Sequence, residues 1–297
     1  MKTLFLLCII ISSFIAKDTI TWMKWDLPPN FILNGPQKGT GWANERLKML
    51  QERLPSYNHK SVVVNVNRLL KIYKQKDNSK TIYCTNDLIS HPTLDIDDYM
   101  SMATFSFKAH FLVTSKAKAH LFGKEGDTLV LENIIKNTNL RLAVAKNRPY
   151  LGASKVMQEY IKRYPNQKHI QFLSNLNIGK SMFSLVFKDR ADYTFEYLDK
   201  SSFYGKELRI LDDIVLFQMK ENEGTFYDFV SCVKTKKGKI VIEKTNNIIR
   251  ELKHTDKWMN AFTKWLPTKR LQDDYIKNYK GVFLQKGDIY DDNPRSK

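Results

Sequence analysis

Residues 188–197, KDRADYTFEY, give the clearest indication of the architecture of this chain. The pattern predicts a helix end, a tight turn and a short strand, which closes on an acidic and an aromatic residue, Glu196 and Tyr197. In an open α/β sheet, ligands bind outside the carboxyl ends of the strands. The segment therefore predicts an α/β fold with Glu196 and Tyr197 at a binding site.

Alternating strand and helix patterns extend from this segment in both directions. Residues 19–25 (TITWMKW) are β-branched and aromatic, as is typical of a strand, and a helix with leucines at positions 47, 50 and 54 follows. Further strands are predicted at 61–66 and 81–85. A second α/β series covers 141–196, so the chain is predicted to contain two doubly wound sheets flanked by helices.

Two apolar stretches, 105–114 and 214–219, bracket the second series and are predicted to cross between two lobes. The first lobe is then discontinuous, formed by residues 17–109 and 216–297, and the second lobe is formed by residues 110–215. We expect residues 225–233 to return to the first lobe as a helix, followed by helices at 240–252 and 258–266.

The N-terminal residues 1–16 have the features of an export signal. Lys2 precedes an apolar run at positions 4–11, and small residues up to Ala16 follow. The run is too short to span a membrane. Cleavage after Ala16 is predicted, which would place the mature protein in the periplasm or outside the cell.

Two cysteines, Cys84 and Cys232, remain after the signal. An even number of cysteines in an oxidising compartment favours a disulfide between them, and two buried thiols are the alternative. The net charge of +17 is compatible with a nucleic-acid or anionic-surface partner. Because the lysines are spread along the chain, a solvated basic surface is the preferred interpretation, and no nucleic-acid partner is predicted.

No motif indicates catalysis, a metal or a cofactor. Gly179-Lys180-Ser181 lacks the earlier glycine of a phosphate-binding loop, because position 174 is serine. Four Asp-Asp pairs look like solvent-facing neighbours, and no Gly-x-Ser-x-Gly turn is present. The histidines show no metal-binding spacing; they stand at positions 59, 91, 110, 120, 169 and 254.

Three segments resemble type 2 periplasmic solute-binding proteins, in the branch similar to bacterial extracellular solute-binding protein family 3, and within it a poorly characterised proteobacterial group. These are the W-x-x-W-D-x-P-P-x-F pattern within residues 20–31, residues 140–152, and the segment 190–197. The resemblance implies a two-lobed fold with a hinge of two crossing strands. It also implies a monomer that captures a small solute between its lobes without chemistry, for a membrane permease of the ABC type or a sensor.

The resemblance and the predicted strand ends also indicate the site. We expect Trp25 and Asp26 to face Glu196 and Tyr197 across the cleft. Amino-acid binders of this fold carry a carboxylate-binding arginine where this chain has Leu94, so a neutral or cationic polar solute is expected. The expected ligand contacts are Trp25, Asp26, Phe31, Asn86, Tyr150, Ser154, Glu196 and Tyr197.

Two other functions remain open at this point. A sensory or interaction protein could use its basic surface to bind an anionic envelope polymer, and such binding would weaken steeply with salt. Binding of a neutral or cationic solute in a cleft would depend on salt only weakly. An enzyme on the same fold is the least supported, because no nucleophile, metal cluster or acid–base pair stands out.

Overall fold

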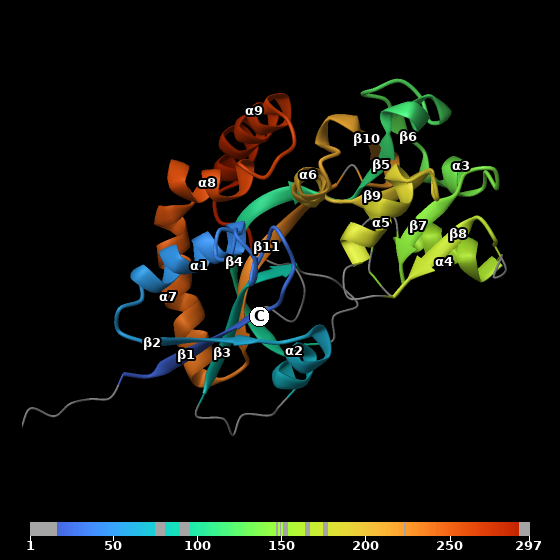
Figure 1. The fold of residues 1–297 in the computed structure, drawn as a ribbon. Helices are drawn as coiled ribbons and strands as arrows, with labels where there is room; N and C mark the ends of the chain where they lie inside the picture. The colour runs from blue at the N-terminus through green and yellow to red at the C-terminus, as the bar shows by residue number, and fades with distance from the viewer. Residues whose placement is uncertain are drawn as a thin grey trace, which may run out of the picture.

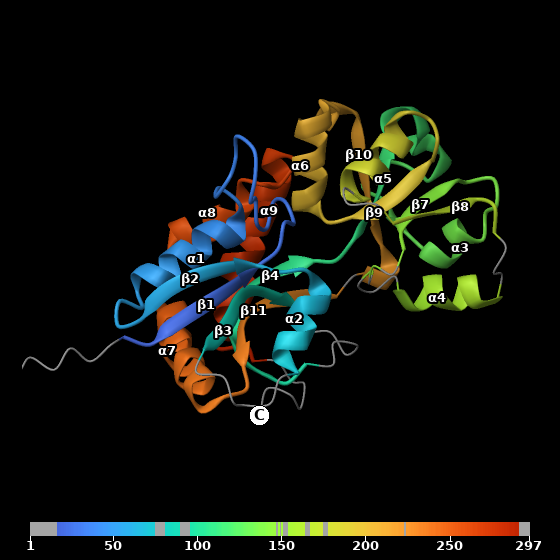
Figure 2. The same cartoon turned by 60° about the horizontal axis from the view of Figure 1, so that its bottom comes forward.

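The computed structural model describes residues 17–74, 81–89, 96–146, 148, 150, 154–163, 167–174, 178–222 and 224–290. The export signal expected at 1–16 and the Leu94 position lie outside these residues. The chain forms two α/β lobes side by side, each built on one sheet (Figure 1, Figure 2). In the described part of the chain, no helix has the length and apolar character needed to cross a membrane.

The first sheet has five strands in the order β2-β1-β3-β11-β4. Helices α1 and α2 connect β1, β2 and β3, which therefore lie parallel, whereas β11 is antiparallel to both of its neighbours. The elements are β1 (Thr19–Lys24), α1 (Trp42–Glu52), β2 (Asn58–Val63), α2 (Val66–Tyr73), β3 (Ile82–Ile89), β4 (Asp98–Lys108) and β11 (Thr225–Val233).

The second sheet has six strands in the order β6-β10-β5-β9-β7-β8. Strand β10 pairs with β5 and β6, so the chain returns to the first sheet only between β10 and β11. The elements are β5 (Phe111–Ser115), β6 (Thr128–Leu129), α3 (Leu131–Ile135), β7 (Leu142–Ala145), α4 (Ser154–Arg163), β8 (Ile170–Leu173), α5 (Ile178–Phe187), β9 (Tyr193–Glu196), α6 (Leu198–Leu208) and β10 (Ile214–Met219).

The fold expected from the sequence, two doubly wound lobes joined by two crossings, is confirmed. Three local predictions were wrong. Residues 214–219, expected to cross between the lobes, form β10 within the second sheet, so the chain returns to the first lobe after Met219 and not from residue 216. The apolar stretch 105–114 is not one strand, because β4 ends at Lys108 and β5 begins at Phe111. Residues 225–233 form strand β11, not a helix. This strand lies between β3 and β4 and its second half is buried, so its side chains lack the alternation that would have identified a strand.

Helices α7 (Lys236–Leu252), α8 (Asp256–Thr263) and α9 (Lys269–Asn278) complete the first lobe, followed by a π-turn, η4 (Tyr279–Phe283). Each helix begins after a threonine whose hydroxyl accepts a hydrogen bond from a backbone N–H of the first turn. The buried Trp258 of α8 donates its indole N–H to the Thr104 carbonyl of β4 at 2.9 Å, which fixes α8 on the sheet.

The predicted disulfide is present, between Cys84 and Cys232, with a Cα–Cα distance of 4.0 Å. The two residues face each other directly in the antiparallel pairing of β3 and β11. Both cysteines are fully buried. The bond therefore ties the chain segment that returns from the second lobe to the segment that precedes the first crossing.

Candidate functional site

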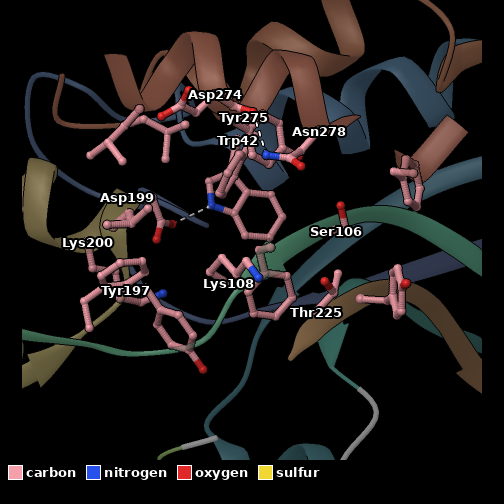
Figure 3. Close-up of a pocket in the computed structure, with 18 of the residues that line it drawn as sticks. Trp42, Ser106, Lys108, Tyr197, Asp199, Lys200, Thr225, Asp274, Tyr275 and Asn278 are labelled. Atoms are coloured by element: carbon pink, nitrogen blue, oxygen red, sulfur yellow. Dashed lines mark hydrogen bonds between the residues drawn. The ribbon is translucent and has the colours of Figure 1, made fainter. Parts of the chain in front are cut away.

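A cavity of about 280 Å³ lies between the two lobes. From the first lobe, the carboxyl end of β3 and the connection after β1 reach it, and from the second lobe the residues that follow β9 do so. These are the sheet edges where α/β folds bind ligands. Figure 3 shows the lining residues, with side chains from α6 facing those from α1 and α9.

The start of α6 is bound directly to the first lobe. Asp199 is buried, and its Oδ2 accepts a hydrogen bond from the Trp42 indole N–H at 3.1 Å (Figure 3). Lys200, also buried, donates to the Asn30 side-chain oxygen at 3.0 Å, and its ammonium lies 4.7 Å from the centre of the Tyr197 ring. Two side-chain hydrogen bonds therefore cross from lobe to lobe inside the cavity wall.

A buried carboxylate continues this chain of contacts. The Asn30 amide nitrogen donates to both oxygens of Asp87, at 3.1 and 3.0 Å, while the Asn30 oxygen accepts from Lys200. Burial raises the pKa of Asp87 to about 6, although the bonds from Asn30 and the charge of Lys200 favour its ionised form. Asp87 is therefore a group that changes charge near neutral pH at the edge of the cavity.

We predict that Asp87→Asn gains stability over the wild type as the pH rises from about 4 to about 6.5. With a pKa raised from 3.8 to about 6, the folded wild type binds this proton more tightly than the unfolded chain does, so it loses stability through that window. Asparagine has no such loss. Urea unfolding at a series of pH values should show the difference growing by about 1–3 kcal/mol. A difference that stays level or shrinks would contradict the assignment.

Aromatic rings form much of the rest of the lining. Phe107, from the first crossing, lies 5.8 Å from Tyr197, measured between ring centres, and contacts it edge-on. Trp42 packs on Phe262 of α8 at 6.0 Å, and Phe262 packs on Tyr275 of α9 at 5.0 Å. The cavity thus offers flat apolar faces beside its charged and polar groups, a combination that suits a small-molecule site.

Glu196, predicted as an anchor for a cation, is bound to Arg148 of its own lobe. Its two oxygens accept from the two terminal nitrogens of Arg148 at 2.5 and 2.7 Å, and the Tyr197 backbone N–H adds a third bond at 3.0 Å. Burial lowers the pKa of Arg148, but the carboxylate of Glu196 outweighs it and raises the pKa overall. Glu196 is 1% exposed, and Asp199, one turn further on, is the carboxylate of this segment that lines the cavity.

The other residues expected from the first lobe lie outside the cavity lining. Trp25 is half-buried and contacts the fully buried Phe31 edge-on, at 5.7 Å between ring centres. Asp26 is exposed and accepts from the Leu33 backbone N–H at 3.3 Å. Asn86 donates to the Ala43 carbonyl at 2.8 Å. Their part in ligand binding stays a prediction.

In the second lobe, Tyr197 lines the cavity, whereas Tyr150 belongs to the buried core and accepts from the Ala145 backbone N–H at 2.8 Å. Ser154 is the first residue of α4, and its side chain lies outside what the structure describes. Tyr197 and Glu196 are adjacent to the lobe interface as expected from the strand end, but only Tyr197 reaches the cavity.

Most of the lining was missed by the sequence reasoning, including the polar or aromatic residues Asn30, Trp42, Asp87 and Asp199. One of them carried a usable signal: Asp199 is an acidic residue in the first turn of the helix that follows β9. The other three come from the loop after β1, the start of α1 and the strand β3, and they meet only in the fold. In the described residues, no three His, Cys, Asp or Glu side chains gather as a metal site would require.

No protein-family model matches the chain, and no curated protein matches it. Solved structures do. The probable amino-acid ABC transporter extracellular-binding protein of Bacillus subtilis is 15% identical with a TM-score of 0.64, over 87% of this chain and 100% of that one. A chain from work on glutathione import in Streptococcus mutans is 14% identical with a TM-score of 0.61, over 86% and 99%.

A histidine kinase sensor domain with similarity to periplasmic binding proteins is 10% identical, with a TM-score of 0.57, over 84% of this chain and 96% of that domain. These likenesses cover nearly the whole of each neighbour. At such identities they establish the fold, and the resemblance expected from the sequence is confirmed at that level. This chain has the two-lobed fold of type 2 periplasmic solute-binding proteins.

Proposed function

We propose that this chain is an exported binding protein that captures a small polar solute, neutral or cationic, between its lobes and presents it to a membrane permease. One observation carries the proposal: the cavity between the lobes is walled by the carboxyl edges of both sheets and receives side chains from each lobe. A solute in that position would contact both lobes at once, so its binding would be coupled to their relative position.

The lining favours holding a solute over transforming it. The described residues around the cavity include no histidine and no cysteine. Two of its carboxylates already accept hydrogen bonds from other side chains of the protein: Asp87 accepts one from Asn30, and Asp199 accepts one from Trp42. The neighbours quoted above are named as transporter binding proteins or as a sensor domain, which supports the same conclusion.

Sensing is the second candidate, favoured by the likeness to a histidine kinase sensor domain. In a sensor on this fold the basic surface could bind an anionic envelope polymer, with the charge of +17 as the attraction. The two candidate functions are separated by measuring how much protein the polymer pulls down at low salt and at high salt. Surface binding should fade as salt screens it, while solute capture in the cavity should persist.

We predict that a cavity-filling substitution abolishes solute binding without unfolding the protein. Ser106 lines the cavity from β4 and is half-buried. In Ser106→Trp the indole should fill the cavity and exclude a solute of any charge. The measurement is a thermal-shift screen of amino acids, polyamines, peptides and sugars, in which a solute at 100 times its dissociation constant stabilises the wild type by about 2.7 kcal/mol.

The matched control is Thr128→Trp, which places the same side chain on an exposed strand position of the second lobe. It should keep the solute-induced shift that Ser106→Trp loses. If no solute in the screen shifts the wild type, or if the shift survives in Ser106→Trp, the cavity is not the binding site and the proposal fails.

A further inference from the structure

We propose that helix α9 is part of the solute site, and that its Asp274, together with Asp199 of the second lobe, makes the site selective for an organic cation. This inference rests on the proposed function, because it concerns the same cavity. It adds an element outside both sheets and it names the class of solute.

Helix α9 and the π-turn after it form one wall of the cavity. The helix contributes Leu271, Asp274, Tyr275 and Asn278 to the lining (Figure 3), and the turn contributes Phe283. The helix has no buried residue of its own. Leu271 and Tyr275 pack partly against the core of the first lobe and also line the cavity, as expected of a segment that shapes a binding site.

The wall is nevertheless fixed in place. The Tyr275 ring packs on Phe262 of α8 at 5.0 Å and is followed by Tyr279 at 5.8 Å. Tyr279, which is buried, donates its hydroxyl to the Lys253 carbonyl at 2.9 Å. The Thr268 hydroxyl accepts from the backbone N–H of Leu271 and so begins the helix at a defined residue. Asp274 is thereby held at a fixed position on the cavity wall.

The charges in the lining favour a cation, in contrast to the charge of the whole chain. In the part of the chain that the structure describes, three carboxylates and two ammonium groups reach the cavity. Asp87 and Lys200 are joined through Asn30 and offset each other. Among the described lining residues, Asp199 and Asp274 then face one remaining ammonium group, Lys108, inside a protein with a net charge of +17. The buried Arg46 lies behind this lining, with its guanidinium 5.6 Å from the centre of the Trp42 ring. The lining surface therefore presents more carboxylates than ammonium groups to a solute, and this favours a cation there.

Asp273 and Asp274 are both exposed, but of the two only Asp274 lines the cavity. Asp273 faces away from the cavity lining and accepts from Lys269 at 2.7 Å, one helical turn earlier. Asp274 lines the cavity, and its backbone carbonyl accepts from the Asn278 side chain at 2.9 Å. Two aspartates in adjacent positions therefore have different surroundings, which supplies a matched pair for experiment.

Aromatic faces complete the recognition chemistry. Trp42, Tyr197 and Tyr275 line the same cavity as the two carboxylates. Aromatic faces attract ammonium and guanidinium groups, most strongly when these are poorly hydrated. The solute class that fits is a compact organic cation, an alkylated ammonium or a guanidinium with an apolar body, that fits into about 280 Å³.

Isothermal titration of the full chain with two pairs of probes tests this. Choline is compared with 3,3-dimethylbutan-1-ol, its uncharged isostere, and L-arginine with L-citrulline. At least one cation should bind about tenfold more tightly than its neutral counterpart. Asp274→Asn should weaken the binding of that cation by about five- to tenfold and leave the affinity for the neutral probe unchanged. Asp273→Asn should change both affinities by less than about twofold.

Each outcome has a separate meaning. If both neutral probes bind as tightly as their cations, or if only neutral solutes of the screen bind and Ser106→Trp abolishes them, cation selection is wrong and solute capture stands. If Asp274→Asn behaves like Asp273→Asn, the role of α9 is wrong. If neither a cationic nor a neutral solute, among the probes and the screen, binds the wild type, the proposed function fails and this inference fails with it.

Discussion

Arg148→Met should lower the free energy of unfolding by about 3–5 kcal/mol, because it leaves the buried Glu196 carboxylate without its partner. Glu196 is 1% exposed, and Arg148 gives it two hydrogen bonds at 2.5 and 2.7 Å. The single remaining bond, from the Tyr197 backbone N–H, cannot replace a guanidinium. Urea unfolding of the variant and the wild type at neutral pH measures the loss.

Two further variants identify the cause. Adding Glu196→Gln to Arg148→Met removes the uncompensated charge and should recover much of the lost stability. Lys136→Met breaks an exposed pair with Glu132 within one helix face and should cost only about 0.3–0.5 kcal/mol. If Arg148→Met costs no more than Lys136→Met, the Arg148–Glu196 pair is not a stabilising feature of the second lobe.

Removing the disulfide should have the second large effect. The bond closes a loop of 148 residues that contains both crossings and the whole second lobe, so it restricts the unfolded chain strongly. The double variant Cys84→Ala, Cys232→Ala should lose about 2–5 kcal/mol of unfolding free energy. Both positions are buried strand residues, and alanine also leaves a small space there.

Reduction of the wild type separates the loss of the disulfide from the effect of the space that alanine leaves. Wild type unfolded and refolded in dithiothreitol lacks the bond but keeps its sulfur atoms, and it should lose most of what the double variant loses. The double variant itself should not respond to dithiothreitol. Full stability of the reduced wild type, or the absence of a Cys84–Cys232 peptide in non-reduced digests, would refute the predicted contribution.

The sequence predicted the parallel parts of both sheets because each is built from local units. Helix α5, within one of these units, has the predicted limits, and so does strand β10, although β10 pairs antiparallel with β5. Strand β11 was missed for the opposite reason. Its partners β3 and β4 lie more than 100 residues earlier, and nothing in its own residues shows that both sides of it are covered.

The residues of the candidate site also fall into those that local sequence predicts and those that depend on distant partners. The end of β9 indicated Tyr197 correctly as adjacent to the opposite lobe, because strand direction is a local property. The partner of Glu196 could not be inferred, since Arg148 reaches it from the connection after β7. The wall formed by α9 follows from the packing of Tyr275 on Phe262, which depends on the positions of two helices and not on either pattern alone.

Helix α6 continues from the second lobe, yet three of its side chains contact the first: Asp199, Lys200 and Phe203, whose ring lies 6.0 Å from that of Trp265. Rotation about the hinge must break both hydrogen bonds and wet these rings, so separation of the lobes has an activation barrier of its own. If the proposed solute binds in the cavity, the rate at which it exchanges would be limited by this barrier. A membrane partner that drew α6 away from the first lobe would speed release without contacting the solute.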